Sequence, residues 1–235
     1  MIWDDIFSNT FKTLRKKIEP ELKKIDFLLP SMPMVNVCRS NDFDFFHPLI
    51  ESGDLTISQM HHAANRYYLG KSKSGKTIFW MIDEMLRPLD GHLGDSWVSS
   101  ALKSREPLLE YWKVKHCLFG LHLLESDNSM PISIVESEQS AVLLSELLPD
   151  SIWMAYAHTS NLSVDLLEPL QGRTVTIYPR TDPTMSNYVF FLEYADLVRR
   201  AYPSINLSID TTLEDRASPS QKSHCIDLLD FLLNE

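Results

Sequence analysis

Cysteine is scarce in this sequence and long apolar runs are missing, and each shortage excludes a class of protein. Only three of the 235 residues are cysteine, at Cys38, Cys117 and Cys225. They are far apart and no two form a CxxC pair, so neither a disulfide framework nor a zinc ribbon is available. We expect three reduced thiols and no zinc site. No apolar stretch approaches the roughly 18 residues that a membrane-spanning helix needs.

Glycine is also scarce, and the few glycines are not placed for nucleotide or acyl chemistry. The seven glycines form no G-x-G-x-x-G pattern, so no nucleotide-cofactor motif is present. Ser137 and Ser140 lack the flanking glycines of a G-x-S-x-G nucleophile elbow. The sequence therefore gives little support to a dinucleotide-binding fold or to a hydrolase triad.

The N-terminal segment, MIWDDIFSNTF, lacks the features of a secretory signal peptide. Asp4 and Asp5 stand where such a peptide carries positive charge, and no small-residue cleavage site follows. We expect a cytoplasmic protein that does not enter a membrane. Apolar residues at three- and four-residue steps predict an amphipathic helix over residues 1–18. Its lysines and arginine suit either a solvated face or a basic arm for nucleic acid or a partner helix.

Negative charge is concentrated in the second half of the chain. The formal net charge is −10, and residues 131–235 hold six Lys/Arg against fifteen Asp/Glu, a net of −9. A protein that binds nucleic acid through phosphates needs a positive face. Any such face must therefore come from the first half.

Residues 70–77 read GKSKSGKT and fit the bare spacing of a phosphate-binding loop. That loop requires a strand before it and a helix after it. Here a predicted helix precedes it, and the β-rich run 77–83 follows it. A basic hairpin turn is the better prediction, and it makes Lys71, Lys73 and Lys76 the candidate contacts for nucleic acid.

The rest of the first half predicts a small α+β region, taken as residues 1–125. Its short elements are helices at Phe43–Glu51 and Thr56–Tyr68, a turn at Pro88–Gly91, a strand within Tyr111–Phe119 and a helical turn at Gly120–Leu124.

From Met130 onward, strands alternate with helices, which predicts a second domain over residues 130–235. This alternation is typical of an α/β fold with a mainly parallel sheet and helices on both faces. The predicted strands are Ile132–Val135, Ile152–Ala157, Thr174–Tyr178 and Ile205–Ile209, and the predicted helices are Ser137–Leu147, Val164–Leu167, Ser186–Tyr202 and Pro219–Leu233.

Polar side chains follow each of these strands, at the edge where parallel sheets place their functional loops. The candidate residues of this strand-end cleft are Glu136, Glu138, His158, Arg180, Asp182 and Asp210.

The segments ISIVESEQSA and LQGRTVTIYPRTD resemble the Toprim domain of primases and topoisomerases. The resemblance implies catalytic, metal-binding carboxylates at Glu136 and Asp182, which in that family hold Mg²⁺ or Mn²⁺ for nucleotidyl transfer or strand cleavage. Arg180 stands where the family has the first aspartate of its DxD motif. This leaves three alternatives: a metal site, an ion pair of Arg180 with the two carboxylates, or a cleft for another ligand.

A wider resemblance covers roughly Phe43 to Glu235. The segments YYLGKSKSGKTIFWMID and YWKVKHCLFGLHLLES are similar to primase-like proteins of bacterial plasmids and integrative elements. The resemblance implies a role in DNA replication or transfer of a mobile element. We expect a catalytically degenerate module that binds single-stranded DNA or a replication or transfer protein. The alternative is an active metal-dependent primase-like nucleotidyl transferase.

Overall fold

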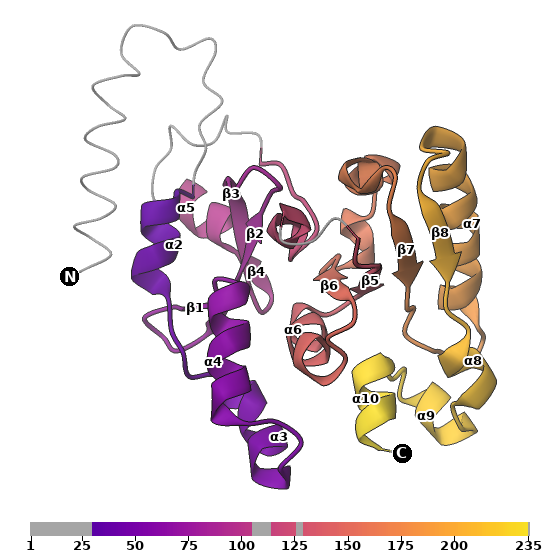
Figure 1. Cartoon of the computed structure of the whole chain (residues 1–235), viewed down its shortest axis with the longest axis horizontal. Helices are drawn as coiled ribbons and strands as arrows, with labels where there is room; N and C mark the ends of the chain where they lie inside the picture. The colour runs from indigo at the N-terminus through magenta and orange to yellow at the C-terminus, as the bar shows by residue number, and fades with distance from the viewer. Residues whose placement is uncertain (1–29, 105–113, 126–128, 235) are drawn as a thin grey trace, which may run out of the picture.

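The computed structural model describes residues 30–104, 114–125 and 129–234. An antiparallel sheet lies in the first half of the chain and a parallel sheet in the second, and the two halves lie next to each other (Figure 1). The predicted helix over residues 1–18 lies outside the described residues. None of the helices in the described ranges has the length and apolarity to cross a membrane.

Short helices open the described chain. α4 begins at a capping box in which the Thr56 hydroxyl accepts from the Gln59 amide while the Gln59 side chain accepts from the Thr56 amide. The helices predicted around residues 43–51 and 56–68 are confirmed. These first helices are α2 (Met32–Cys38), the 3-10 turn η1 (Asp44–Phe46), α3 (His47–Ser52) and α4 (Ile57–Arg66).

The antiparallel sheet has four strands in the order β1-β2-β3-β4 and is followed by a helix. The predicted hairpin at residues 70–77 is confirmed, because β1 and β2 pair across it. The elements are β1 (Gly70–Lys71), β2 (Thr77–Ile82), β3 (Pro88–Leu93), β4 (Ser96–Trp97) and α5 (Val98–Lys103).

The turn predicted at Pro88–Gly91 is wrong, because those residues form most of β3. The chain reverses earlier, where the Asp83 carboxylate accepts hydrogen bonds from the amides of Met85 and Arg87. Gly91 lies in the strand and pairs with Trp80. A glycine is needed there because an added Cβ would lie 2.8 Å from the Trp80 ring. Pro88 is tolerated because it is the first residue of its strand.

The parallel sheet has four strands in the order β6-β5-β7-β8, so the predicted α/β architecture with a parallel sheet is confirmed. The four predicted strands all form, with ends within two residues of the prediction. The elements are β5 (Ile132–Val135), α6 (Glu138–Leu147), β6 (Ile152–Ala155), the 3-10 turns η4 (Thr159–Asn161) and η5 (Val164–Leu170), β7 (Thr174–Ile177), α7 (Ser186–Ala201) and β8 (Asn206–Ile209).

The central strand β5 and the edge strand β6 of this sheet are covered on both faces. Every residue of β5 and β6 is buried, which is the pattern expected of strands enclosed between two layers. α6 is also buried on most of its circumference, because it contacts the sheet, α4 of the first half and α10. α7 packs with η5 and β8.

The single helix predicted at Pro219–Leu233 is wrong. The chain forms α8 (Thr212–Arg216), α9 (Pro219–Ser223) and α10 (Leu228–Leu233). The break between α9 and α10 contains Cys225, whose φ of 52° is left-handed and cannot continue a helix. Asp227 then starts α10 by accepting from the Asp230 amide.

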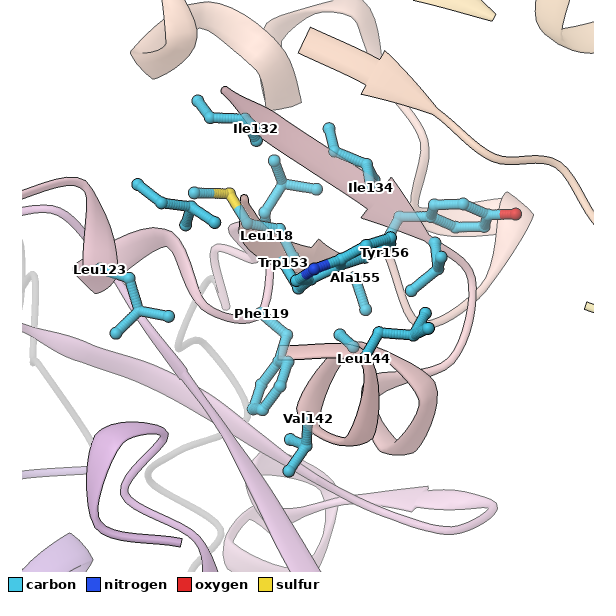
Figure 2. Packing of buried hydrophobic residues seen from close by; sticks show 14 of the residues in the cluster. Leu118, Phe119, Leu123, Ile132, Ile134, Val142, Leu144, Trp153, Ala155 and Tyr156 are labelled. Carbon is cyan, nitrogen blue, oxygen red and sulfur yellow. The ribbon is translucent and has the colours of Figure 1, made fainter. Parts of the chain in front are cut away.

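The two halves share one apolar core, which Figure 2 shows from close by. Phe119 points from the end of the first half toward α6 and stacks on Tyr67 with ring centroids 5.1 Å apart. Its backbone exchanges two hydrogen bonds with Ala155 of β6, at 2.8 and 3.1 Å. The strand predicted within Tyr111–Phe119 does not form over residues 114–119, where only this isolated bridge occurs, and the 3-10 turn η3 (Leu121–Glu125) confirms the next predicted turn.

Both outer edges of the parallel sheet carry side-chain or backbone partners. On β6, the Trp153 carbonyl accepts from the Tyr67 hydroxyl at 2.8 Å, beside the Phe119–Ala155 bridge. Gly120 permits this approach, because a Cβ there would lie 2.9 Å from the Trp153 carbonyl oxygen. On β8, the Leu207 carbonyl accepts from Arg199 at 3.0 Å.

Candidate functional site

Glu136 and Arg180 meet at the carboxyl ends of two adjacent strands. β5 and β7 are neighbours in the sheet. The connection after β5 leads to β6 at one edge, whereas the connection after β7 leads to β8 at the other edge. Ligands of open α/β sheets bind at such a point. Glu136 follows β5, and its Oε2 lies 3.3 Å from Nε of Arg180. Of the predicted ion pair of Arg180 with both carboxylates, the structure contains the contact with Glu136.

Asp182 lies just beyond, but its carboxylate is committed to the start of α7. Oδ1 accepts from the Thr184 amide at 2.8 Å, from the Ser186 amide at 3.2 Å and from both of their hydroxyls. Oδ2 accepts from the Asn187 amide at 2.8 Å. Five donors therefore occupy this carboxylate, which acts as a cap for the helix.

These hydrogen bonds determine the ionisation of Asp182. Burial alone would raise the pKa of the carboxyl, but the bonds from Thr184, Asn187 and Ser186 outweigh it and hold the pKa far below its usual range. Asp182 is therefore a carboxylate at every physiological pH. Its charge is balanced by local donors, which leaves little of its coordination capacity for a cation.

Tyr156 contributes a polar group beside the ion pair. The residue follows β6, is 3% exposed, and its hydroxyl has no hydrogen-bond partner among the described residues. Figure 2 shows its ring extending beyond the tip of β5, away from the labelled apolar side chains. Burial raises the pKa of Tyr156 far above its usual value, and the charge of Glu136 adds to the effect. The hydroxyl therefore stays protonated and remains a donor.

Glu138 does not join Glu136, although both follow β5. Its side chain is nearly buried in the first turn of α6, and its Oε1 lies 2.6 Å from Nδ1 of His92 on β3. The hydrogen bond with Glu138 raises the pKa of His92, against the opposing effect of burial. Glu138, predicted as a cleft residue, pairs with a histidine of the other sheet.

The remaining predicted cleft residues lie at other strand ends. Asp210 follows β8 and accepts from the Thr212 amide at the start of α8. His158 follows β6 and is exposed.

The basic hairpin is less basic than its sequence indicates. Lys71 Nζ lies 3.6 Å from Asp44 and 3.9 Å from Asp42, so two carboxylates offset its charge. Lys73 and Lys76 are exposed at the turn. Lys73 and Lys76, unlike Lys71, form no ion pair with a residue that the structure describes.

A cluster that the sequence did not reveal lies on β3 and β4. Trp97 stacks between His92 and His116, with ring centroids at 4.7 and 4.2 Å. His116 Nε2 lies 3.2 Å from the fully buried Asp90, which also accepts from the Ser99 amide at 2.9 Å. Asp90 and His92 are two residues apart, the spacing that places side chains on one face of a strand. The prediction of a turn at residues 88–91 excluded this interpretation.

The residues at the switch between β5 and β7 do not fit a divalent cation. Mg²⁺ and Mn²⁺ require several free oxygen ligands. Here the guanidinium of Arg180 pairs with the carboxylate of Glu136, and the carboxylate of Asp182 already accepts hydrogen bonds from the start of α7. Over residues 30–104, 114–125 and 129–234, no group of three or more His, Cys, Asp or Glu side chains is placed to hold a metal ion.

Comparison with known families gives one match. Residues 87–181 match the model of a domain of unknown function, DUF6371. The matched segment contains β3 and the Trp97 cluster as well as Glu136 and Arg180. The chain is similar to that family over this segment, which ends one residue before Asp182. A search of curated proteins found no match.

Proposed function

We propose that the chain is a non-catalytic binding module of Toprim-like type that serves the replication or transfer machinery of a mobile element in the cytoplasm. The observation that carries the proposal is the saturation of Asp182 by five hydrogen-bond donors. A carboxylate that caps a helix in this way is a poor ligand for a metal ion, which is what nucleotidyl transfer would require.

The ion pair of Glu136 and Arg180 supports the same proposal. An arginine at this place supplies positive charge where a catalytic site of the Toprim type would need a bound cation. The pair is partly exposed, with side-chain exposures of 20% for Glu136 and 45% for Arg180, so its contribution to folding stability is small. A pair of opposite charges at the ends of these two strands suits the binding of a polar partner better than it suits catalysis.

A replication or transfer protein is the partner that the charge distribution favours. The second half carries a net charge of −9, which repels phosphates and attracts basic protein surfaces. Single-stranded DNA is a second candidate, because Lys73 and Lys76 are exposed on one turn. Those two charges alone supply only weak, salt-dependent affinity.

Calorimetry with Mn²⁺ and Mg²⁺ tests the non-catalytic assignment. We expect no binding heat that depends on Glu136, so the wild type and E136Q give the same trace. A heat that E136Q abolishes would contradict the proposal and favour the active metal-dependent nucleotidyl transferase. R180D is the informative variant: a gain of Mn²⁺ binding, lost again in R180D/E136Q, would identify the site as an eroded metal centre.

Fluorescence anisotropy with a labelled oligothymidylate tests the second candidate. If the hairpin binds single strands, the K73A/K76A variant weakens binding and lowers its salt dependence. K71A is the matched control, because Asp42 and Asp44 already offset the charge of Lys71. Equal affinities for all three proteins would remove the hairpin from any DNA-binding role.

A further inference from the structure

The contact between the two halves of the chain contains two imidazole–carboxylate pairs, both on α6. His92 of β3 meets Glu138 at the first turn of α6, at 2.6 Å. His62 of α4 meets Glu146 near the last turn of the same helix, at 2.7 Å. In each pair the histidine belongs to the first half and the carboxylate to the second. We call these two pairs the α6 seam.

Both carboxylates of the seam are nearly buried. The side chains of Glu138 and Glu146 are each 7% exposed. A buried carboxylate is costly unless it is hydrogen-bonded and paired with a positive charge. Among the residues that the structure describes, the ion-pair partner of Glu138 and of Glu146 is the facing imidazole. The charge of that imidazole depends on pH within the range that cells experience.

We propose that the α6 seam is a pH-responsive device that protonation tightens and deprotonation loosens, so that the two halves are held together more firmly in mild acid than in mild alkali. This proposal is independent of the metal and DNA questions. A charged imidazole forms a charge-assisted hydrogen bond to its carboxylate, roughly twice as strong as the neutral one. The neutral imidazole keeps a weaker bond, so the junction loosens without separating.

The surroundings of His92 favour its charged form. Glu138 faces it from α6, while Asp90 on β3 and Asp95 in the β3–β4 turn add negative charge. Trp97 stacks on one face of the ring and separates it from His116, the other titratable group nearby. These groups raise the pKa of His92, although its partial burial opposes them. The stabilisation is therefore present below the unfolded pKa of about 6.5 and is lost as pH rises through the folded value.

The second pair is the weaker of the two. His62 is 63% exposed, so solvent screens its charge. The Glu146 carbonyl also accepts from Gln59 of α4 at 3.4 Å, a contact that does not titrate. Arg66, a further positive side chain, lies one turn further along α4. Most of the pH response should therefore come from His92.

Urea unfolding of the full chain at pH 6 and pH 8 tests the proposal, with H92Q as the main variant. Glutamine keeps a donor for Glu138 but carries no charge. Because His122 is buried and its pKa is lowered to about 4, its own contribution to stability changes over the lower part of this range. The measured quantity is therefore the ratio of the folding constants of the wild type and H92Q at each pH.

We expect that ratio to be on the order of fivefold larger at pH 6 than at pH 8. H47Q is the control, because His47 pairs with Asp42 at 2.9 Å wholly within the first half, where both side chains are exposed. A ratio for H92Q that is equal at the two pH values, or larger at pH 8, would overturn the proposal. If H92Q does not fold, E138Q replaces it, and a ratio of the wild-type folding constant to that of E138Q that does not fall from pH 6 to pH 8 would be equally decisive.

Discussion

The two sheets of this molecule are stabilised in different ways. In the parallel sheet, the central strand β5 and the edge strand β6 are buried on both faces, and α6 and α7 pack against the sheet. The antiparallel sheet has two different faces: one joins the main core through Met81, and the other packs Trp80 against α2 and α5 in a separate cluster. The first depends on broad apolar burial, which tolerates many sequences, and the second depends on a few close contacts.

This difference determines where each half is sensitive to substitution. In the parallel half, a buried position can exchange one apolar residue for another of similar size at modest cost. In the antiparallel half, the indole of Trp80 lies between Gly70 and Gly91, and a methyl group at either glycine would approach it within 3.0 Å. Phe119 joins the two halves, so it should be more sensitive than a position in either one.

The largest effect is expected for F119A. Phe119 is fully buried between Tyr67 and Phe79, with ring centroids at 5.1 and 5.6 Å. Its loss should lower the free energy of unfolding by about 3–5 kcal/mol. Urea unfolding followed by circular dichroism and by tryptophan fluorescence should show one transition in the wild type and an earlier one in the variant.

A matched change on the surface controls for the chemistry. Phe190 of α7 is 42% exposed, so F190A should alter stability by about 0.5 kcal/mol or less. Two separate transitions in the wild type would contradict the single shared core.

A smaller effect is expected for G91A in the antiparallel sheet. The added Cβ would stand 2.8 Å from Trp80 and 2.9 Å from Val98, and relieving these contacts should cost about 1–3 kcal/mol. A double-mutant cycle with W80L identifies the cause. The cost of G91A should fall in the W80L background, because the smaller side chain makes room. An unchanged cost would place the strain elsewhere in β3.

The smallest effect is expected for D182A, which removes the cap of α7. The loss should be about 1–2 kcal/mol at pH 7. Because the pKa of Asp182 is lowered in the folded state, its contribution is present above the unfolded value of about 3.9 and declines as pH falls below it. The difference between the wild type and D182A should therefore shrink from pH 6 to pH 3 in urea unfolding.

Asparagine offers a control at the same position. D182N retains one carbonyl acceptor for the amides of α7, so it should be less destabilising than D182A at pH 7. A D182A deficit that is the same at pH 3 and pH 6 would show that the carboxylate charge is not what stabilises the helix.

The sequence predicted the parallel half better than the antiparallel half, and the physical reason lies in the range of the signals. Runs such as Ile132–Val135 and Thr174–Ile177 are set by burial and β-branching, which a single sequence displays. β3 was missed because Pro88 and Gly91 are typical turn residues. Only the ring of Trp80 on the paired strand explains why a glycine lies within β3. The division of the last helix at Cys225 depends on a backbone angle that no residue pattern announced.

The candidate site was predicted only in part. Parallel-strand geometry correctly brought Glu136 next to Arg180. The hydrogen bonds of Asp182 could not be foreseen, because they depend on how the chain bends into α7. The pairing of Glu138 with His92 joins residues 46 positions apart on different sheets, and no local pattern contains that information.

The treatment of the outer strands has a consequence for how this molecule can associate. Along β6, the hydroxyl of Tyr67 and the backbone of Phe119 already engage the groups that a foreign chain would need, and on β8 an arginine covers one of the outward carbonyls. Strand addition, the common route both to peptide recognition and to amyloid-like stacking, is therefore blocked at β6 and hindered at β8. A partner that binds the parallel sheet must therefore contact its side chains and loops.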